Sequence, residues 1–189
     1  MTTSDAELAR QALEGSQEAY RTLVSRYSSA AVNIAARLVR DRALAEDLAQ
    51  EAFVRAFARL KTYDPQRKFS SWFFQVLHNV SVDHLRRRRL ETVSLDGLQT
   101  DGYSGPPTDP AASPEAAAER TALGSALRAA LLRIRLAYRE PLVLKYQQGL
   151  GVEEIAEILG LPEGTVKTHL HRGRKELADI LAAAGWKPD

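Results

Sequence analysis

The sequence predicts an all-α protein of two small helical domains, residues 1–90 and 114–189, joined by a flexible linker at 91–113. Apolar residues recur at spacings of three and four through both outer segments, and the first shows none of the period-two alternation of strands. The segment between them is rich in glycine, proline, serine and acidic residues, a composition too polar to form a core. A length of 189 residues accommodates two small domains.

The first domain is predicted to begin with two helices. Ser4 and Glu7 have the spacing of a capping box, in which hydroxyl and carboxylate satisfy free backbone donors of the first turn. This helix is expected to end near Gly15, and Ser16 can cap the next. The second helix carries apolar positions at helical spacing, namely Tyr20, Leu23, Val24, Tyr27, Ala31, Ile34 and Leu38.

Two further helices complete the predicted first domain. Asp41 begins a third helix, which ends before Asp64-Pro65. Ser70 or Ser71 begins a fourth, which runs to the four arginines at 86–89. The face of the fourth helix that we expect to pack in the core carries Phe73, Leu77 and Val80.

In the second domain, Ser113 can cap a helix that has Pro114 at its first position. Pro141 is expected to open another helix, which ends near Gln148. One apolar stripe on the earlier helix consists of Leu123, Leu127, Leu131 and Ile134.

Residues 152–183 have the spacing of a helix-turn-helix, with a first helix at 152–159 and a second at 163–183. Ala156 is small where the two helices would cross, and Gly160 can adopt the left-handed conformation of the turn. The second helix presents cations and hydrogen-bonding groups that suit base edges in a major groove. The residues predicted to contact DNA are Thr165, Lys167, Thr168, His169, His171, Arg172 and Arg174. Among them, His169 and Arg174 fit phosphates better than bases, and a solvated basic helix is the alternative.

The fourth helix carries a second polar stripe of aromatic, amide, carboxylate and guanidinium groups at spacings of three and four. Such groups can hold an unpaired base, since a ring stacks on it, an amide bonds its edge and arginines hold the backbone. The candidate residues, with those of the preceding loop, are Tyr63, Lys68, Phe69, Trp72, Asn79, Asp83, Arg86 and Arg87. The alternatives are that Trp72 anchors the core, that Asn79 caps or faces solvent, and that Asp83 only pairs with Arg87.

Asp47, Gln50 and Glu51 share one face of the third helix. Taken alone, this pattern favours ordinary surface carboxylates.

Charge, composition and the absence of certain motifs argue against several functional classes of protein. The net charge is only +2, but basic residues gather at 86–89 and 167–175, which indicates two nucleic-acid contacts. The chain has no cysteine, and its four histidines form no metal cluster, so neither a metal nor another cofactor is expected. No phosphate loop or nucleophile–base pair is evident, so the chain is not expected to be an enzyme. Without a signal peptide or membrane span, we expect a cytoplasmic protein.

On these motifs the chain resembles the extracytoplasmic-function (ECF) sigma factors of bacterial RNA polymerase. Residues 13–20, with Leu23 and Tyr27, resemble the family's opening helices, and 47–53 its polymerase-clamp-binding motif. Residues 69–79, with Asp83, resemble the part that captures a flipped base of the minus-ten element. Residues 153–166 resemble its reader of the minus-thirty-five element.

The resemblance implies a transcription initiation factor with several partners. Asp47, Gln50, Glu51 and Phe53 would bind core RNA polymerase at the clamp coiled coil of its largest subunit, and the polymerase flap is a further expected partner. Promoter DNA would bind both domains. A separate anti-sigma factor is expected to control the protein and could hold it near the inner membrane, without membrane insertion of the chain itself.

Besides an enzyme, two other functions are alternatives to a sigma factor. A stand-alone regulator would use the same helix-turn-helix, but such a module buries only roughly 600–1,000 Å² on DNA, and no dimerisation stripe is left over. A protein-only adaptor would not need two basic clusters. Whether promoter binding requires core polymerase discriminates between these readings.

Overall fold

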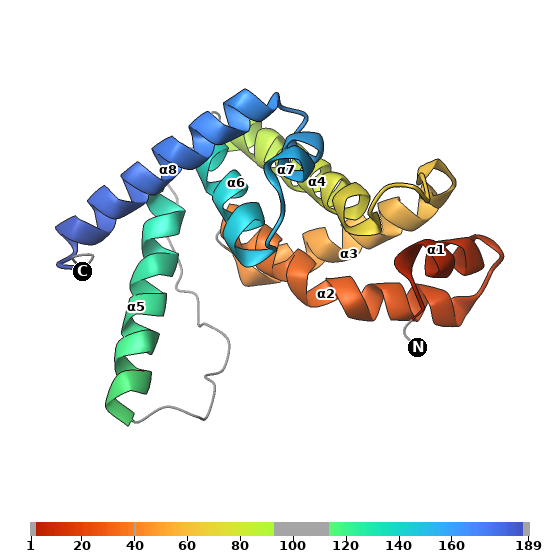
Figure 1. Ribbon diagram of the computed structural model, residues 1–189, viewed down its shortest axis with the longest axis horizontal. Coiled ribbons are helices and arrows are strands. Elements are labelled where there is room, and N and C mark those ends of the chain that lie inside the picture. The colour runs from red at the N-terminus through yellow and green to blue at the C-terminus, as the bar shows by residue number, and fades with distance from the viewer. Residues whose placement is uncertain (1–2, 40, 93–113, 187–189) are drawn as a thin grey trace.

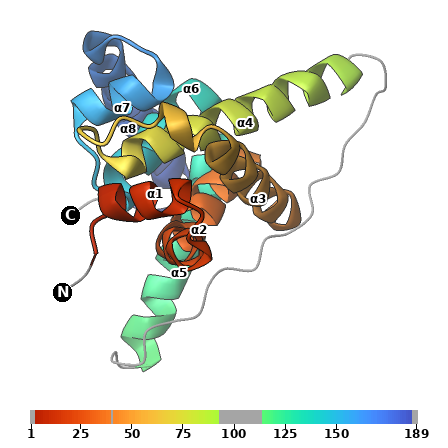
Figure 2. The ribbon, with the colours of Figure 1, turned by 90° about the vertical axis from the view of Figure 1, so that its right-hand side faces the viewer.

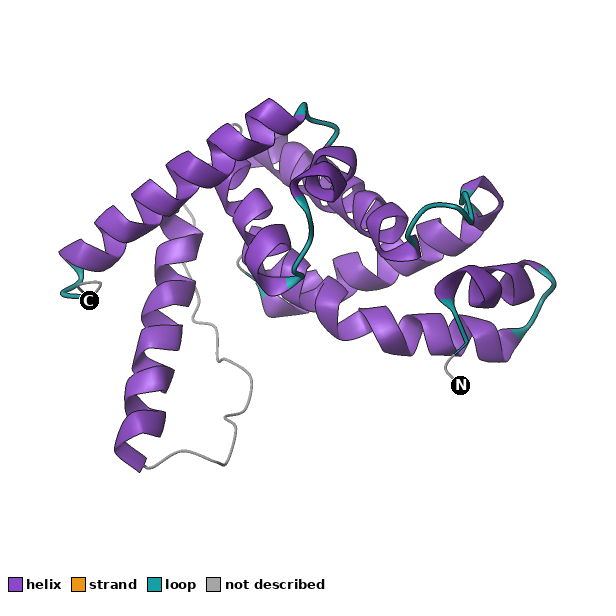
Figure 3. Cartoon of the chain, in the orientation of Figure 1, coloured by secondary structure: helices purple, strands orange, loops and turns teal. Residues whose placement is uncertain are grey.

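The structure is a computed structural model that describes residues 3–39, 41–92 and 114–186. The described residues form helices and connecting turns with no strand (Figure 3), which confirms the predicted all-α class. The elements are α1 (Asp5–Leu13), α2 (Gln17–Val39), α3 (Arg42–Ala58), the 3-10 helix η1 (Leu60–Thr62), α4 (Phe69–Thr92), α5 (Pro114–Arg133), α6 (Leu136–Gln147), α7 (Val152–Leu159) and α8 (Glu163–Ala183). We call α1–α4 the first lobe and α5–α8 the second lobe. Most of the predicted linker, 93–113, lies outside the described residues.

Side-chain caps mark the starts of three helices of the first lobe, α1, α2 and α3. The backbone N–H of Glu7 donates to Ser4 Oγ, that of Ala19 to Ser16 Oγ, and that of Leu44 to Asp41 Oδ1. Only half of the predicted capping box at α1 forms, because the Glu7 carboxylate accepts from Arg10 and Gln11 along the helix instead.

Aromatic rings fill the centre of the first lobe. Phe73 stacks on Phe53 with ring centroids 4.4 Å apart, and Tyr27 packs beside Phe69, Phe73 and Phe74. Each favourable pair of this kind adds about 0.5–1.5 kcal/mol beyond the burial of its area. The predicted core face of α4 is confirmed, since Phe73, Leu77 and Val80 are fully buried.

The second lobe is built around a close crossing of α6 and α8. Gly173 of α8 is buried against Tyr138 and Leu142 of α6, and a Cβ at this position would lie 2.9 Å from Leu142 Cδ1. The turn between α7 and α8 forms as predicted, because Gly160 adopts a φ of 62° in the left-handed region.

Two expectations for the second lobe differ from the structure. Helix α6 begins at Leu136, so Pro141 lies inside the helix rather than at its start. The missing N–H of Pro141 leaves one helical hydrogen bond unmade, yet this stretch of α6 is held by burial from Arg139 to Leu144. In the predicted apolar stripe, Leu131 of α5 and Ile134, which follows α5, are buried, whereas Leu123 and Leu127 are exposed. Figure 1 shows α5 extending away from the other helices.

The two lobes pack on each other. Helix α7 lies against α4, and α6 lies against the C-terminal part of α2 (Figures 1 and 2). Buried apolar residues of both lobes therefore belong to one continuous core. None of the described helices combines the length and apolar character needed to span a membrane.

Candidate nucleic-acid and polymerase-binding surfaces

Helix α8 presents a polar face to solvent. Val166 and Leu170 are buried beneath it, and this anchoring turns Lys167 and Thr168 outward. Of the predicted DNA contacts, five are exposed, namely Lys167, Thr168, His171, Arg172 and Arg174. Lys167 pairs with Glu163 at 3.2 Å, and Arg174 donates to the Tyr146 hydroxyl at 3.1 Å. Both are exposed interactions that a phosphate could replace.

The other two predicted contacts of α8 lie closer to the protein. The ring of His169 packs against Tyr138 of α6, with centroids 5.3 Å apart, and its Nδ1 is buried. Thr165 is half-buried in the first turn. His169 is therefore turned towards α6 in this structure, and its contact with a phosphate stays a prediction.

The polar residues Asn79, Asp83, Arg86 and Arg87 are all exposed on α4. Asn79 is exposed near the middle of the helix, and Arg86 and Arg87 are exposed towards its end. Asp83 lies 3.8 Å from Arg55 Nη1 of α3, while Arg87 Nε donates to the backbone oxygen of Asp83. The predicted alternative, a side-chain pair between Asp83 and Arg87, is thus replaced by a contact with α3.

The rings next to this stripe are not equally available. Phe69 is 1% exposed and Tyr63 is 7% exposed, with the Tyr63 hydroxyl donating to the backbone oxygen of Arg67. Both rings contribute to the aromatic core, so in this arrangement neither offers a face to a base. Trp72 is half-buried and packs on both of them. Trp72 therefore remains the aromatic candidate, with one part in the core and one part towards solvent.

The loop before α4 carries two exposed cations that pair with the second lobe. Arg67 Nη2 lies 2.9 Å from Glu157 Oε1, and Lys68 Nζ lies 2.8 Å from Glu154 Oε1. The Glu154 carboxylate raises the pKa of Lys68, and Lys68, followed by the N–H of Gly151, lowers the pKa of Glu154. Lys68 was predicted as a DNA contact from sequence, but its partner 86 residues away was not.

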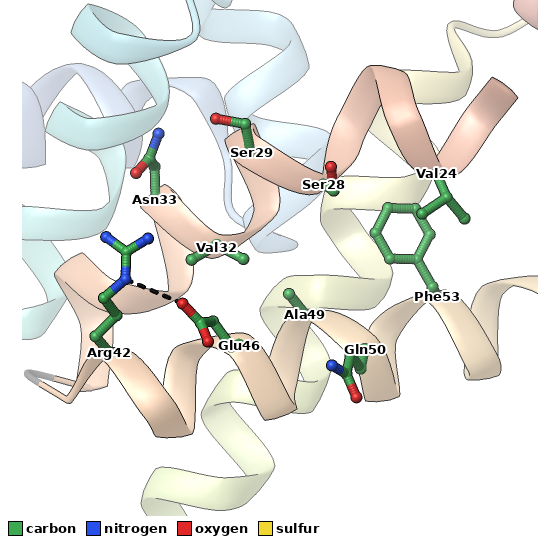
Figure 4. Close-up of a pocket in the computed structure, with 10 residues that line it drawn as sticks. All are labelled: Val24, Ser28, Ser29, Val32, Asn33, Arg42, Glu46, Ala49, Gln50 and Phe53. Carbon is green, nitrogen blue, oxygen red and sulfur yellow. Dashed lines mark hydrogen bonds and ion pairs between the residues drawn. The ribbon is translucent and has the colours of Figure 1, made fainter. Parts of the chain in front are cut away.

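A groove runs between α2 and α3 (Figure 4). Its walls are formed by Val24, Ser28, Ser29, Val32 and Asn33 of α2 and by Arg42, Glu46, Ala49, Gln50 and Phe53 of α3. Gln50 and Phe53 of the predicted polymerase-binding set thus line it, and Asp47 is exposed on the same helix. Glu51 pairs with Arg55 at 2.5 Å.

Contacts at α6 join the lobes, and sequence reasoning missed them. Arg139, which is 4% exposed, donates through Nη1 to the backbone oxygens of Arg37 and Leu38 at the end of α2. Its Nη2 donates to Leu132 and Ile134 oxygens within the second lobe. A guanidinium suits the free carbonyls of a helix C-terminus. No sequence spacing reveals a pairing across 102 residues.

No group of three potential metal ligands occurs in the part of the chain that the structure describes.

Comparison with known proteins decides the family. Residues 23–91 match the sigma-70 region 2 family model, and residues 125–177 match the sigma-70 region 4 model. The ECF RNA polymerase sigma factor SigW of Bacillus subtilis (strain 168) is 34% identical over 184 residues, covering 91% of this chain and 94% of SigW. The chain belongs to the ECF sigma factors. As a sigma factor, it directs promoter-specific initiation of transcription by RNA polymerase.

Solved structures agree with the fold of this sigma factor. CnrH in complex with the cytosolic domain of CnrY matches with a TM-score of 0.70 and 26% identity, covering 96% of this chain and 99% of CnrH. The sigma factor RpoE, solved in complex with the anti-sigma factor NepR from Bartonella quintana, has a TM-score of 0.71 at 23% identity. That match covers 86% of this chain and 96% of RpoE. The region 2 match includes the α2/α3 groove and the α4 stripe, and the region 4 match includes the predicted DNA contacts of α8.

Proposed function

We propose that the sigma factor divides its work among three surfaces. The groove between α2 and α3, with Asp47, Gln50 and Phe53, docks on core RNA polymerase at the clamp coiled coil of the largest subunit. The α4 stripe captures an unpaired base of the minus-ten element, and α8 reads the minus-thirty-five element. The segment 1–90 would thus act on polymerase and the minus-ten element, 114–189 on the minus-thirty-five element and the polymerase flap, and 91–113 would be their tether.

The observation that carries this proposal is the exposed polar face of α8 behind its buried anchors Val166 and Leu170. A helix held in this way can enter a major groove, where Arg172 is suited to a guanine edge and Lys167 to a base edge or phosphate.

The α4 stripe supports the minus-ten role. The exposed amide of Asn79 can bond a base edge, the half-buried Trp72 can stack, and Arg86 and Arg87 can hold the strand backbone. Stacking of a base on an aromatic ring contributes about 1–3 kcal/mol, similar to the few kcal/mol needed to extrude a base.

We expect each lobe alone to bind DNA weakly. Non-specific binding of small modules lies around 10⁻⁴ to 10⁻⁶ M, so useful affinity requires both lobes to be docked on polymerase. We also propose control by an anti-sigma factor, since the related RpoE was solved in complex with one.

The test is co-elution of the purified chain with bacterial core RNA polymerase in size-exclusion chromatography. Wild type should co-elute, and the double variant Asp47→Ala/Gln50→Ala should not, with unchanged helicity because both side chains are exposed. The double variant Glu153→Gln/Asp179→Asn, which changes two exposed carboxylates of the second lobe, is the control and should co-elute. Equal co-elution of all three proteins would refute the assigned groove.

A further inference from the structure

Helix α7 lies across the loop that leads into the α4 stripe. Its carboxylates Glu157 and Glu154 pair with Arg67 and Lys68 of that loop at 2.9 and 2.8 Å. About two turns further along α4, Gln75 Nε2 donates to the backbone oxygen of Glu157 at 3.0 Å. Three polar side chains of the first lobe, those of Arg67, Lys68 and Gln75, thus bond to α7.

The same loop borders the proposed minus-ten surface. Trp72, the candidate stacking platform, packs on Tyr63 of this loop with ring centroids 5.5 Å apart. A strand whose base stacks on Trp72 would therefore carry its phosphates past Arg67 and Lys68. Carboxylate and phosphate oxygens accept the same charge-assisted hydrogen bonds from guanidinium and ammonium groups.

We infer that α7 is an internal competitor of promoter DNA, in which Glu154 and Glu157 occupy the sites of two phosphates on Lys68 and Arg67. This inference rests on the proposed minus-ten role of α4. In the arrangement seen here, which we call the closed arrangement, the loop cations are neutralised and a single strand is excluded from them. Separation of the lobes would release both cations to the DNA.

The strength of the pairs suits a reversible block. Lys68 is 72% exposed and Arg67 62% exposed in their side chains, and ion pairs this exposed are individually weak and screened by salt. The buried contacts at Arg139 hold the lobes together, so α7 is kept in place without strong pairs of its own.

The block is also selective. The polar face of α8 and the residues Asp47 and Gln50 remain exposed in the closed arrangement. The free sigma factor can therefore meet polymerase and duplex DNA while its minus-ten surface is still closed, an order that disfavours premature capture of single strands.

The test measures binding of a mixed-sequence single-stranded DNA to the full chain by fluorescence anisotropy. The double variant Glu154→Gln/Glu157→Gln frees both cations and retains a side chain that can cap α7 at position 154. We expect it to bind about tenfold more tightly than wild type at low salt, because two more phosphates are neutralised. Its plot of log K against log salt concentration should be steeper by about 1.4, at roughly 0.7 for each phosphate of a single strand.

The matched control is Glu153→Gln/Asp179→Asn, which removes the same charge from exposed carboxylates that form no ion pair within the described residues. It should keep the wild-type salt slope. Equal slopes and affinities for all three proteins, or no single-strand binding by any of them, would overturn the inference if co-elution with polymerase is intact. Failure of every variant to co-elute with polymerase would instead point to failure of the proposed function.

Discussion

His78 of α4 and Glu140 of α6 form a contact that joins the two lobes, with Nδ1 lying 2.6 Å from Oε1 and both side chains mostly buried. The two residues are 62 positions apart. Their contact lies on the same side of α4 as Gln75, which also bonds to the second lobe. One stripe of α4 therefore contributes to closure of the sigma factor, beside the contacts of Arg139 with α2, and the predicted DNA-binding stripe is adjacent to it.

The first prediction concerns this contact. His78→Ala should favour separation of the lobes, because it leaves a mostly buried carboxylate without its partner, at a cost of about 1–3 kcal/mol. The chain has no cysteine, so dyes can be attached to cysteines placed at the exposed positions Ala58 and Ala178. Single-molecule energy transfer should then show a larger distance for His78→Ala. His171→Ala, an exposed change, is the control, and an unchanged distance in His78→Ala would contradict the assigned role of the contact.

The second prediction concerns the crossing of α6 and α8. In Gly173→Ala the new Cβ would lie 2.9 Å from Leu142 Cδ1 and 3.2 Å from the backbone oxygen of Tyr138. Overpacking of this kind costs about 1–3 kcal/mol, against a gain of about 1 kcal/mol for alanine over glycine in a helix. Thermal or urea unfolding should show a net loss of stability. Gly164→Ala in the same helix meets nothing within 4 Å and should be neutral or stabilising; a loss equal to that of Gly173→Ala would argue against the crowding.

The third prediction concerns pH. Lys68 and the N–H of Gly151 lower the pKa of Glu154 below its ordinary value of 4.5. Because the lobes carry this pair only when closed, its contribution to closure is present above that value and is lost as pH falls through the lowered pKa. An NMR titration should show the pKa of Glu154 rising towards the ordinary value in Lys68→Met. Lys175→Met, which changes an exposed lysine of α8, should leave it unaltered. A Glu154 titration unaffected by Lys68→Met would contradict the pairing.

The fourth prediction concerns base reading by α8. Arg172 is exposed on the reader face, and a good arginine–guanine contact contributes about 1–3 kcal/mol of discrimination. Arg172→Ala should therefore lose that much preference between a promoter and its minus-thirty-five variants, as measured by competition binding of the polymerase complex. Lys175→Ala serves as the comparison for loss of charge alone. Equal weakening on every sequence would reassign Arg172 to a phosphate.

Local features of the fold could be predicted because their causes are local. A hydroxyl or carboxylate before an apolar periodic run caps a helix, as Ser16 and Asp41 do. A glycine between two amphipathic helices supplies the left-handed turn, as Gly160 does. The buried face of α4 followed from spacing alone.

The structure differs from the sequence-based expectations where tertiary packing overrides local preference. Proline is enriched at the first position of helices, but α6 begins five residues before Pro141, in a stretch that is buried from Arg139 to Leu144. Phe69 is an aromatic residue of a type that can stack on a base. It lies in the first turn of α4, however, and its ring packs in the aromatic core. The orientation of His169 towards Tyr138 likewise depends on how α6 crosses α8.

The contacts between the lobes leave no trace in sequence spacing. Arg67 and Glu157 are 90 residues apart, and each has the appearance of an ordinary surface charge. Only their juxtaposition shows that the acidic face of α7 lies over cations suited to DNA.

The most direct measurement is run-off transcription by bacterial core RNA polymerase on a library of promoter fragments, with and without the purified chain. The account predicts that new, sequence-specific transcripts appear only when the chain is added, and that Asp47→Ala/Gln50→Ala and Asn79→Ala each abolish or greatly reduce them. Identical transcripts in the presence and absence of the wild-type chain, with active polymerase, would contradict the central claim.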